Sequence, residues 1–196
     1  MDHGLARPRI AVFGSSTVQR GEPAWEQARA LGAALARAGA DVVTGGYSGT
    51  MEACSQGAHE AGGHVVGVTV DLFEARGGAN AYVRERVHTA SLYQRLEVLI
   101  ETAGGFVVLP GSLGTLTELF LAWTLLSVEG RAAAPLVLLG DHWPAFLAAL
   151  RHPDMVRPAL FPFVQTASGP EDAARRALAG VGGARAVPAH PFRSEP

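Results

Sequence analysis

The chain has 196 residues, a length that fits one large domain better than two small ones. Hydrophobic residues make up 48% of the sequence and charged residues 17%, with 24 glycines and 12 prolines. This composition suits a compact, loop-rich protein and excludes a disordered, collagen-like or coiled-coil chain. The net charge of −2 argues against a nucleic-acid partner, because proteins that bind nucleic acid carry a basic excess or a basic stripe.

The 16 positively charged side chains are all arginine, and the sequence contains no lysine. Pyridoxal-phosphate enzymes need a lysine for their Schiff base, and Walker-type phosphate loops also need one, so both mechanisms are excluded. Cys54 is the only cysteine and has no disulfide partner within the chain, which favours a reducing compartment such as the cytoplasm. The first residues lack a signal-peptide core, and glycines and a proline interrupt the longest lightly charged stretch, 102–128, so we expect no membrane span.

Short apolar runs alternate with longer stretches of helical periodicity from residue 9 onward. This alternation is typical of a parallel sheet with helices on both faces. The sequence therefore predicts an α/β fold of three layers, a mostly parallel, doubly wound sheet flanked by helices. We expect strands at 10–13, 41–44, 64–70, 106–109 and 136–139, and helices at 23–38, 49–61, 91–102, 115–128, 144–150 and 171–178.

Two segments lack any clear period. Residues 71–86 place Gly77, Gly78 and Asn80 among charged residues, and we predict an irregular loop or flap there. Residues 181–196 mix glycine, proline, alanine and arginine, which predicts a flexible tail. Because no repeat or linker divides the rest, we expect residues 1–180 to form a single domain.

Three glycine-rich turns follow predicted strands, where an open parallel sheet collects its ligands. They are Gly14-Ser15-Ser16, Gly45-Gly46-Tyr47-Ser48-Gly49-Thr50 and Pro110-Gly111-Ser112-Leu113-Gly114-Thr115. Glycines let backbone N–H groups approach an anion closely, and the dipole of the following helix favours negative charge there. Each turn also has a purely structural interpretation, because such glycines permit tight chain reversal and close helix packing.

Glu118 and Arg95 each have two interpretations. Thr115 and Glu118 fit the Thr-x-x-Glu spacing of a capping box, which would stabilise the helix and nothing else. Alternatively, Glu118 places a carboxylate one turn above an anion site, close to a sugar attached to the bound phosphate. Arg95 lies on the flank of an apolar helical stripe, where it either covers apolar surface with its stem or extends its guanidinium to the sheet edge.

The motifs together resemble a known family. Pro110-Gly111-Ser112-Leu113-Gly114-Thr115-Leu116-Thr117-Glu118 is similar to the PGGxGTxxE signature of the Lonely Guy (LOG) proteins, formerly described as lysine decarboxylases. Gly45-Gly46-Tyr47-Ser48-Gly49-Thr50-Met51 resembles the earlier GGxxGxM turn of that family, and Leu92-Tyr93-Gln94-Arg95-Leu96 occupies the place of its MxxRK segment. The resemblance covers roughly residues 9–140.

This resemblance implies a Rossmann-like homodimer that hydrolyses the N-glycosidic bond of nucleoside 5′-monophosphates, including cytokinin precursors, and releases the base and ribose 5-phosphate. The catalytic residues of the family fall on Arg95 and Glu118. Its phosphate loop and other ligand contacts fall on Gly111, Ser112, Gly114, Thr115, Gly45, Gly46, Gly49, Ser15 and Thr124. The implied ligand is an AMP-like nucleoside monophosphate, with no cofactor.

The chain departs from the family pattern at three positions. Ser112 replaces the second glycine of the signature, Leu96 replaces the lysine after the arginine, and Tyr47 replaces a glycine of the earlier turn. These departures motivate a second hypothesis, a protein of the same fold that binds a nucleotide or a molybdopterin-type cofactor without turnover. A DNA-processing relative is a third hypothesis, which the acidic charge balance disfavours.

A metal site is not expected. Cys54, His59 and His64 are spaced by five residues, but His64 begins a predicted strand and no fourth ligand is evident. The predicted helix 115–128 is apolar on nearly all sides, and such a helix must be covered on several sides. We therefore expect a homodimer whose interface lies near this helix.

Overall fold

The computed structural model describes residues 7–74, 77–128, 134–152 and 154–181. Among these residues, one sheet contains seven parallel strands in the order β4-β3-β2-β1-β5-β6-β7. The central strands are buried on both faces and rich in valine and leucine, as strands between two helical layers must be. The strands are β1 (Arg9–Phe13), β2 (Asp41–Thr44), β3 (Val65–Val70), β4 (Glu85–Thr89), β5 (Gly105–Val108), β6 (Leu136–Leu139) and β7 (Val164–Ala167).

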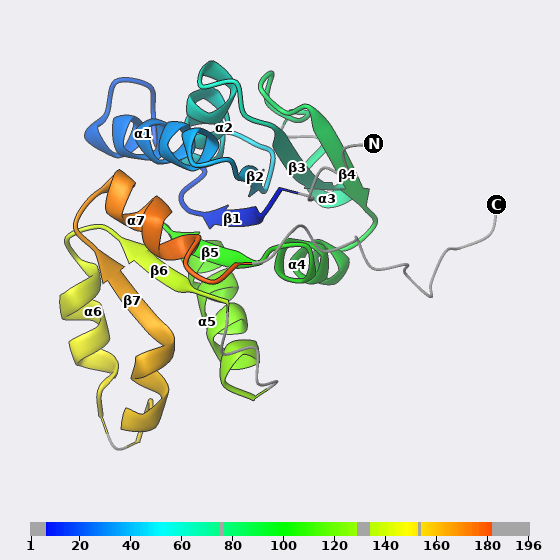
Figure 1. Cartoon of the computed structure of the whole chain (residues 1–196). Coiled ribbons are helices and arrows are strands. Elements are labelled where there is room, and N and C mark those ends of the chain that lie inside the picture. Colours follow the sequence, from blue (N-terminus) through cyan, green and yellow to red (C-terminus); the bar gives the residue numbers. More distant parts are fainter. Residues whose placement is uncertain (1–6, 75–76, 129–133, 153, 182–196) are drawn as a thin grey trace, which may run out of the picture.

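Helices cover both faces of this sheet (Figure 1). The layer of α1, α2 and α7 buries Leu31 and Leu35 against one face, and the layer of α4, α5 and α6 buries Leu99 and Leu119 against the other. The predicted three-layer, doubly wound α/β fold is thereby confirmed. The helices are α1 (Pro23–Arg37), α2 (Thr50–Glu60), α3 (Asp71–Glu74), α4 (Leu92–Glu101), α5 (Leu113–Val128), α6 (Trp143–Leu150) and α7 (Pro170–Ala177), with a 3₁₀ segment η1 (Pro158–Phe163).

The strand order reverses next to β1. The chain adds strands outward from β1 to β4 and then returns to pair β5 with the other side of β1. Ligands of such sheets bind outside the carboxyl ends of the strands at this reversal. The turns that follow β1 and β5 contact each other directly, because the Ser15 N–H donates to the Pro110 carbonyl oxygen at 3.1 Å.

Two strands were not expected from the sequence. The segment 71–86, predicted as an irregular loop, contains α3 and the first residues of β4, and β7 follows η1. Both strands lie at the edges of the sheet and carry charged or polar residues such as Glu85, His88 and Gln165. An edge strand exposes one side to water, so it lacks the apolar run by which the buried strands are recognised.

The start of α5 also differs from the expectation. The helix begins at Leu113, two residues before the predicted start, and its first backbone bond joins the Leu116 N–H to the Ser112 carbonyl at 3.0 Å. Thr115 therefore lies within the first turn and is not the residue that caps the helix. The capping-box interpretation of Thr115 and Glu118 is wrong, because that motif requires Thr115 in the capping position.

The other predicted boundaries agree with the structure to within one residue. The predicted tail falls, apart from Val181, on residues outside the described ranges. No helix in those ranges is both long and apolar enough to cross a lipid bilayer.

Candidate functional site

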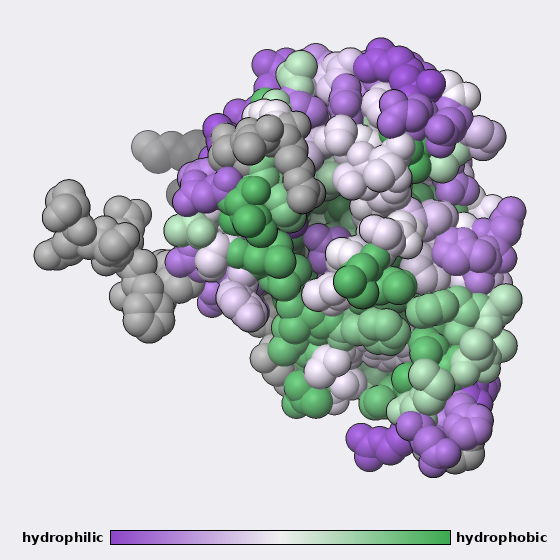
Figure 2. Space-filling view, turned by 180° about the vertical axis from the view of Figure 1, so that it is seen from behind, coloured by the Kyte–Doolittle hydropathy of each residue, from purple (hydrophilic) through white to green (hydrophobic). Residues whose placement is uncertain are grey.

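A cavity of about 330 Å³ opens at the carboxyl edge of the sheet, beside the reversal of strand order. Its walls come from the segments that follow β1, β2, β3 and β5, together with side chains of α4 and α5. A volume of this size lies at the lower end of the range of small-molecule sites, which is roughly 300–1,000 Å³. Figure 2 shows the molecule from behind, with a hollow that has hydrophilic atoms inside it and hydrophobic surface on its left and below it.

Arg95 is a buried residue that lines this cavity. Ser91 caps α4 by accepting a hydrogen bond from the Gln94 N–H at 3.2 Å, so Arg95 lies in the first turn of the helix. Its side chain points inward and is only 7% exposed. Arg95 Nε donates to the Val68 carbonyl at 2.8 Å, and Nη2 donates to the Gly45 carbonyl at 3.2 Å. The guanidinium thus reaches the sheet edge. The other interpretation, in which the aliphatic part of Arg95 covers apolar surface and its charge stays in solvent, is wrong.

Two aromatic rings flank the Arg95 guanidinium. Its Cζ lies 5.7 Å from the centre of the Tyr47 ring and 5.8 Å from that of Phe73, distances at which cation–π attraction operates. The Tyr47 hydroxyl is fixed in turn, because it donates to the Val70 carbonyl at 3.1 Å and accepts from the Val70 N–H at 2.8 Å. The orientation of Arg95 is therefore determined by β2, β3 and α3 together.

Glu118 extends from α5 toward Arg95. Its Oε1 lies 3.8 Å from Arg95 Nη1, and the Glu118 side chain is 12% exposed. Burial raises the pKa of Glu118 to about 7, and the positive charge of Arg95 opposes part of this rise. Burial also lowers the pKa of Arg95 from its usual value, an effect that the Glu118 carboxylate counteracts. A carboxyl group that titrates near neutral pH in a cavity is a typical feature of a catalytic site.

The N-terminus of α5 faces the same cavity. Ser112, Gly114 and Thr115 line it, and within the described ranges no acceptor is found for the N–H groups of residues 112–115. Such unpaired N–H groups at a helix start, together with the helix dipole, form a site for an anion such as phosphate. The cavity therefore brings together a helix N-terminus suited to an anion, a carboxyl group and a guanidinium.

Several of the predicted glycines shape the site. Gly45 lines the cavity, and a Cβ there would overlap Arg95 Nη2. Gly49 has a positive φ of 71°, and a Cβ at that position would overlap the Ser15 carbonyl oxygen. Gly46 also has a positive φ, of 80°, and packs against the backbone of Gly67. Glycine is required at 45 for the close approach of the guanidinium and at 46 and 49 for the shape of the turn.

The remaining predicted residues lie outside the cavity wall. A Cβ at Gly111 would overlap Thr115 Oγ1, so this glycine permits the tight start of α5. The Ser15 carbonyl accepts from the Thr50 N–H at 2.8 Å, while its own N–H is bonded to Pro110, so Ser15 joins three loops. Thr124 is exposed two turns further along α5 and is not among the residues that line the cavity.

The sequence interpretation assigned no role to several residues that line the cavity. Tyr47 belongs to the second glycine-rich turn, Met51 and Glu52 belong to the first turn of α2, and Phe73 and Asn80 belong to the segment predicted as a flap. The Asn80 side-chain amide donates to the Gly46 carbonyl at 3.1 Å and to the Tyr47 carbonyl at 3.0 Å. The only signal in the sequence was that this segment follows a strand at the ligand-binding edge.

Cys54, His59 and His64 do not form a metal site in the structure. Cys54 is buried in the apolar core, and burial raises the pKa of its thiol to about 12. His64 instead pairs with Glu85 at 3.0 Å on the sheet edge. In the described part of the chain, no group of three or more histidine, cysteine or acidic residues is arranged to hold a metal ion.

Comparison with known proteins places this geometry in a family. Residues 7–129, more than half of the chain, match the model described as the SLOG cluster4 family. The chain belongs to the LOG (SLOG cluster4) family. Members of the LOG family are not pyridoxal-dependent lysine decarboxylases, in agreement with the absence of lysine.

Among its LOG relatives is the cytokinin riboside 5′-monophosphate phosphoribohydrolase of Mycobacterium tuberculosis, 33% identical over 138 residues, which cover 70% of this chain and 72% of that protein. The protein of the same name from Rhodococcoides fascians is 33% identical over 144 residues, covering 70% and 71% of the two chains. A solved structure, the molybdenum cofactor binding protein of Rippkaea orientalis, matches with a TM-score of 0.68 and 25% identity, covering 86% of this chain and 94% of that one.

Proposed function

We propose that this LOG-family protein hydrolyses the N-glycosidic bond of nucleoside 5′-monophosphates. One water molecule is consumed: its oxygen bonds to C1′ of the ribose, the C1′–N bond breaks, and the base leaves with a proton. The products are the free base and ribose 5-phosphate. The observation that carries the proposal is the placement of Glu118 and Arg95 over one cavity, in front of the unpaired N–H groups of α5. The names of the relatives from Mycobacterium tuberculosis and Rhodococcoides fascians support it.

In this mechanism the helix start holds the phosphate and Glu118 acts at the sugar. The N–H groups of Ser112, Gly114 and Thr115 donate hydrogen bonds to the oxygens of the 5′-phosphate, which places the attached ribose beside Glu118. Cleavage of a glycosidic bond passes through an oxocarbenium-like state with positive charge at C1′. The ionised carboxylate of Glu118, whose side chain is 12% exposed, stabilises this charge and orients the attacking water.

Arg95 acts as a cation in a fixed orientation. An arginine guanidinium does not release its proton in proteins, so Arg95 is not the general acid. The two carbonyl oxygens and two aromatic rings around it leave Nη1 directed toward Glu118. Arg95 therefore positions the carboxylate and binds an oxygen of the phosphate or the ribose.

The test is to incubate the protein with AMP, GMP, IMP or CMP and to measure the released base by chromatography. We expect Glu118→Gln to lose at least about 100-fold in kcat, as typical for a general acid–base or charge-stabilising group. Arg95→Lys keeps a positive charge but cannot bind two carbonyls in the same geometry, and we expect a loss of similar size. Glu171→Gln, an exposed carboxyl group on α7, is the control and should retain full activity. Equal activity of wild type and Glu118→Gln would contradict the proposal.

A second candidate function is binding of a molybdenum cofactor without turnover. The structural match to the binding protein of Rippkaea orientalis supports it, and the N-terminus of α5 would suit any phosphorylated ligand. The buried carboxyl group of Glu118 favours the hydrolase, because a carrier of anions gains nothing from an acidic side chain in its cavity. Tight nucleotide or pterin binding with no release of base would favour the carrier.

We also propose that the protein is a homodimer that buries the face formed by α4 and α5. Tyr93, Leu113 and Val128 are 86%, 79% and 70% exposed on these two helices. Figure 2 shows hydrophobic surface on the left of the hollow and below it. Apolar patches of this kind on a soluble domain indicate a protein interface. The reducing compartment expected for a single, buried cysteine makes the cytoplasm the proposed location.

A further inference from the structure

The α2 wall of the cavity carries a carboxylate that the proposed mechanism does not use. Glu52 lies in the first turn of α2 and lines the cavity, with its side chain 29% exposed. Its Oε1 lies 3.6 Å from Arg20 Nη2, whereas Oε2 has no partner within the described ranges. Arg20 is itself 61% exposed and lies over the ring of Trp25 at 5.2 Å, so solvent screens its pairing with Glu52.

Neighbouring polar side chains on this wall are engaged with the protein. The Ser48 hydroxyl donates to the Ser16 carbonyl at 3.0 Å. The Asn80 amide group donates to two carbonyls of the β2 turn, and its Oδ1 accepts from the Tyr82 N–H at 3.2 Å. Glu52 therefore offers a charged acceptor with free capacity to whatever occupies this side of the cavity.

The position of Glu52 relates it to the base of a bound nucleotide. Glu118 and the phosphate-binding helix start belong to α5, in one helical layer, whereas α2 belongs to the layer on the opposite face of the sheet (Figure 1). A nucleotide with its phosphate on α5 and its C1′ at Glu118 has only the base left to fill the remaining part of the cavity. That part is lined by the β1 and β2 turns, by Phe73 and the segment that follows α3, and by Met51 and Glu52 of α2, and Glu52 is the ionisable side chain among them whose carboxylate keeps a free oxygen in the described residues.

We propose that Glu52 recognises the base and selects guanine. This inference rests on the proposed function, which it deepens by naming the substrate class. An ionised carboxylate accepts hydrogen bonds at two oxygens and donates none. Guanine presents two adjacent donors, N1–H and the N2 amino group, so both can bond to one carboxylate. Adenine presents a single amino group next to the acceptor N1, which faces the carboxylate unfavourably.

A purely structural role for Glu52 makes a different prediction. A carboxylate in the first turn of a helix stabilises it through the helix dipole, and Glu52 also pairs with Arg20. If Glu52 has only that role, its substitution lowers the melting temperature and changes kcat/KM for all substrates by the same factor. If Glu52 recognises the base, its substitution changes the ratio of kcat/KM between substrates.

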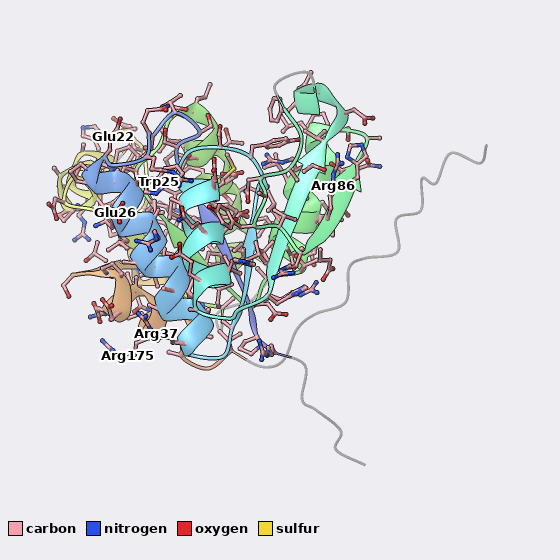
Figure 3. The ribbon with its side chains drawn as sticks, turned by 90° about the horizontal axis from the view of Figure 1, so that it is seen from above. Glu22, Trp25, Glu26, Arg37, Arg86 and Arg175 are labelled. Carbon is pink, nitrogen blue, oxygen red and sulfur yellow. The ribbon has the colours of Figure 1, made fainter. Side chains whose placement is uncertain are left out.

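The experiment compares kcat/KM for GMP and AMP in wild type and Glu52→Gln. The glutamine amide offers one donor and one acceptor, which matches adenine better than guanine. Glu26→Gln is the matched control, because Glu26 also lies in the first turn of a helix, α1, and pairs with an arginine, Arg29, at 3.4 Å. Figure 3 shows Glu26 on α1 beside Trp25. Ribose 5-phosphate has no base, so its inhibition constant measures whether the contacts to the sugar and the phosphate are unchanged.

We expect wild type to prefer GMP to AMP and Glu52→Gln to lower the GMP-to-AMP ratio at least about tenfold, the size of one bidentate contact to a base. The Glu26→Gln ratio and inhibition by ribose 5-phosphate should not change. A wild type without preference for GMP, or a ratio unchanged in Glu52→Gln, would overturn the assignment. If wild type releases no base from either nucleotide, the proposed function fails. The role of Glu52 is then decided by the dissociation constants of GMP and AMP, compared between wild type and Glu52→Gln.

Discussion

Glu118 links the chemistry of the site to the stability of the fold. Its pKa rises to about 7 on folding because burial disfavours the ionised carboxylate. The folded state therefore binds the proton more tightly than the unfolded state, in which the carboxyl group titrates near 4.5. The resulting stabilisation is fully present below about pH 4.5 and is lost as pH rises through about 7. The ionised form of Glu118, which the proposed mechanism uses, is thus the one that costs stability.

This leads to a prediction for thermal unfolding between pH 5 and 8.5. Glutamine mimics the protonated carboxyl group, so Glu118→Gln should match wild type in stability at pH 5 and exceed it at pH 8.5. The difference should be roughly 2–3 kcal/mol, since one pKa unit corresponds to about 1.4 kcal/mol. Differential scanning calorimetry across this range measures it. A difference in unfolding free energy between the two proteins that does not vary with pH would contradict the raised pKa of Glu118.

Ionisation of Glu118 should raise activity as pH increases, whereas it lowers stability. The proposed mechanism uses ionised Glu118, so kcat/KM should rise with pH and level off above an apparent pKa near 7. A pH–rate profile for the preferred nucleotide gives this value. Activity that falls through this range would assign Glu118 to the acid step instead.

At the scale of single residues, the sequence motifs indicated Arg95 and Glu118 but not their surroundings. The structure brings these two side chains together, at 3.8 Å, as the family signature implies. Tyr47 and Phe73, whose rings flank Arg95, had no comparable signal, because one replaces a glycine and the other lies in a segment without periodicity. Their role depends on contacts between β2, β3 and α4 that no local pattern encodes.

At the scale of the element, two glycines at the start of α5 have different requirements: Gly111 precedes the helix by two residues, and Gly114 lies in its first turn. A Cβ at Gly111 would overlap Thr115 Oγ1, whereas a Cβ at Gly114 would have no heavy atom within 4 Å. We therefore expect Gly111→Ala to destabilise the protein and weaken inhibition by inorganic phosphate. Gly114→Ala should instead raise stability by about 0.5–1 kcal/mol, because alanine favours a helix over glycine.

Chemical denaturation and phosphate inhibition of both variants test this contrast. Similar free energies of unfolding for Gly111→Ala and Gly114→Ala would show that the helix start tolerates a side chain at either position. The steric account of the turn would then be wrong.

Buried strands were predictable from the sequence, whereas edge strands and the start of α5 were not. β1, β2, β3, β5 and β6 consist mainly of valine, leucine and other apolar residues and lie between two helical layers. In β4, Glu85, Arg86 and His88 stand beside valine and threonine, and this segment is a strand through its pairing with β3 at the edge of the sheet. At α5, the Thr-x-x-Glu pattern suggested a capping residue, although the helix starts at Leu113, where Gly111 leaves room for the Thr115 side chain.

At the scale of the whole molecule, the proposed dimer can be tested by light scattering. We expect wild type at twice the mass of the chain. Tyr93→Glu combined with Val128→Glu places two charges on the exposed apolar face without disturbing the core, since both side chains are largely exposed. This variant should be monomeric and still folded by circular dichroism. Wild type at the mass of one chain would remove the proposed dimer.

The proposed hydrolysis requires both the phosphate contacts at the N-terminus of α5 and the carboxylate of Glu118. The most direct measurement is release of base by purified wild type from each nucleoside 5′-monophosphate and from the corresponding nucleoside, with ribose 5-phosphate quantified in parallel. We predict equal amounts of base and ribose 5-phosphate from at least one monophosphate, and at least about 100-fold slower release from its nucleoside, because loss of the phosphate contacts removes binding energy used in the transition state. No release of base from any monophosphate, or equal rates with the nucleosides, would contradict it.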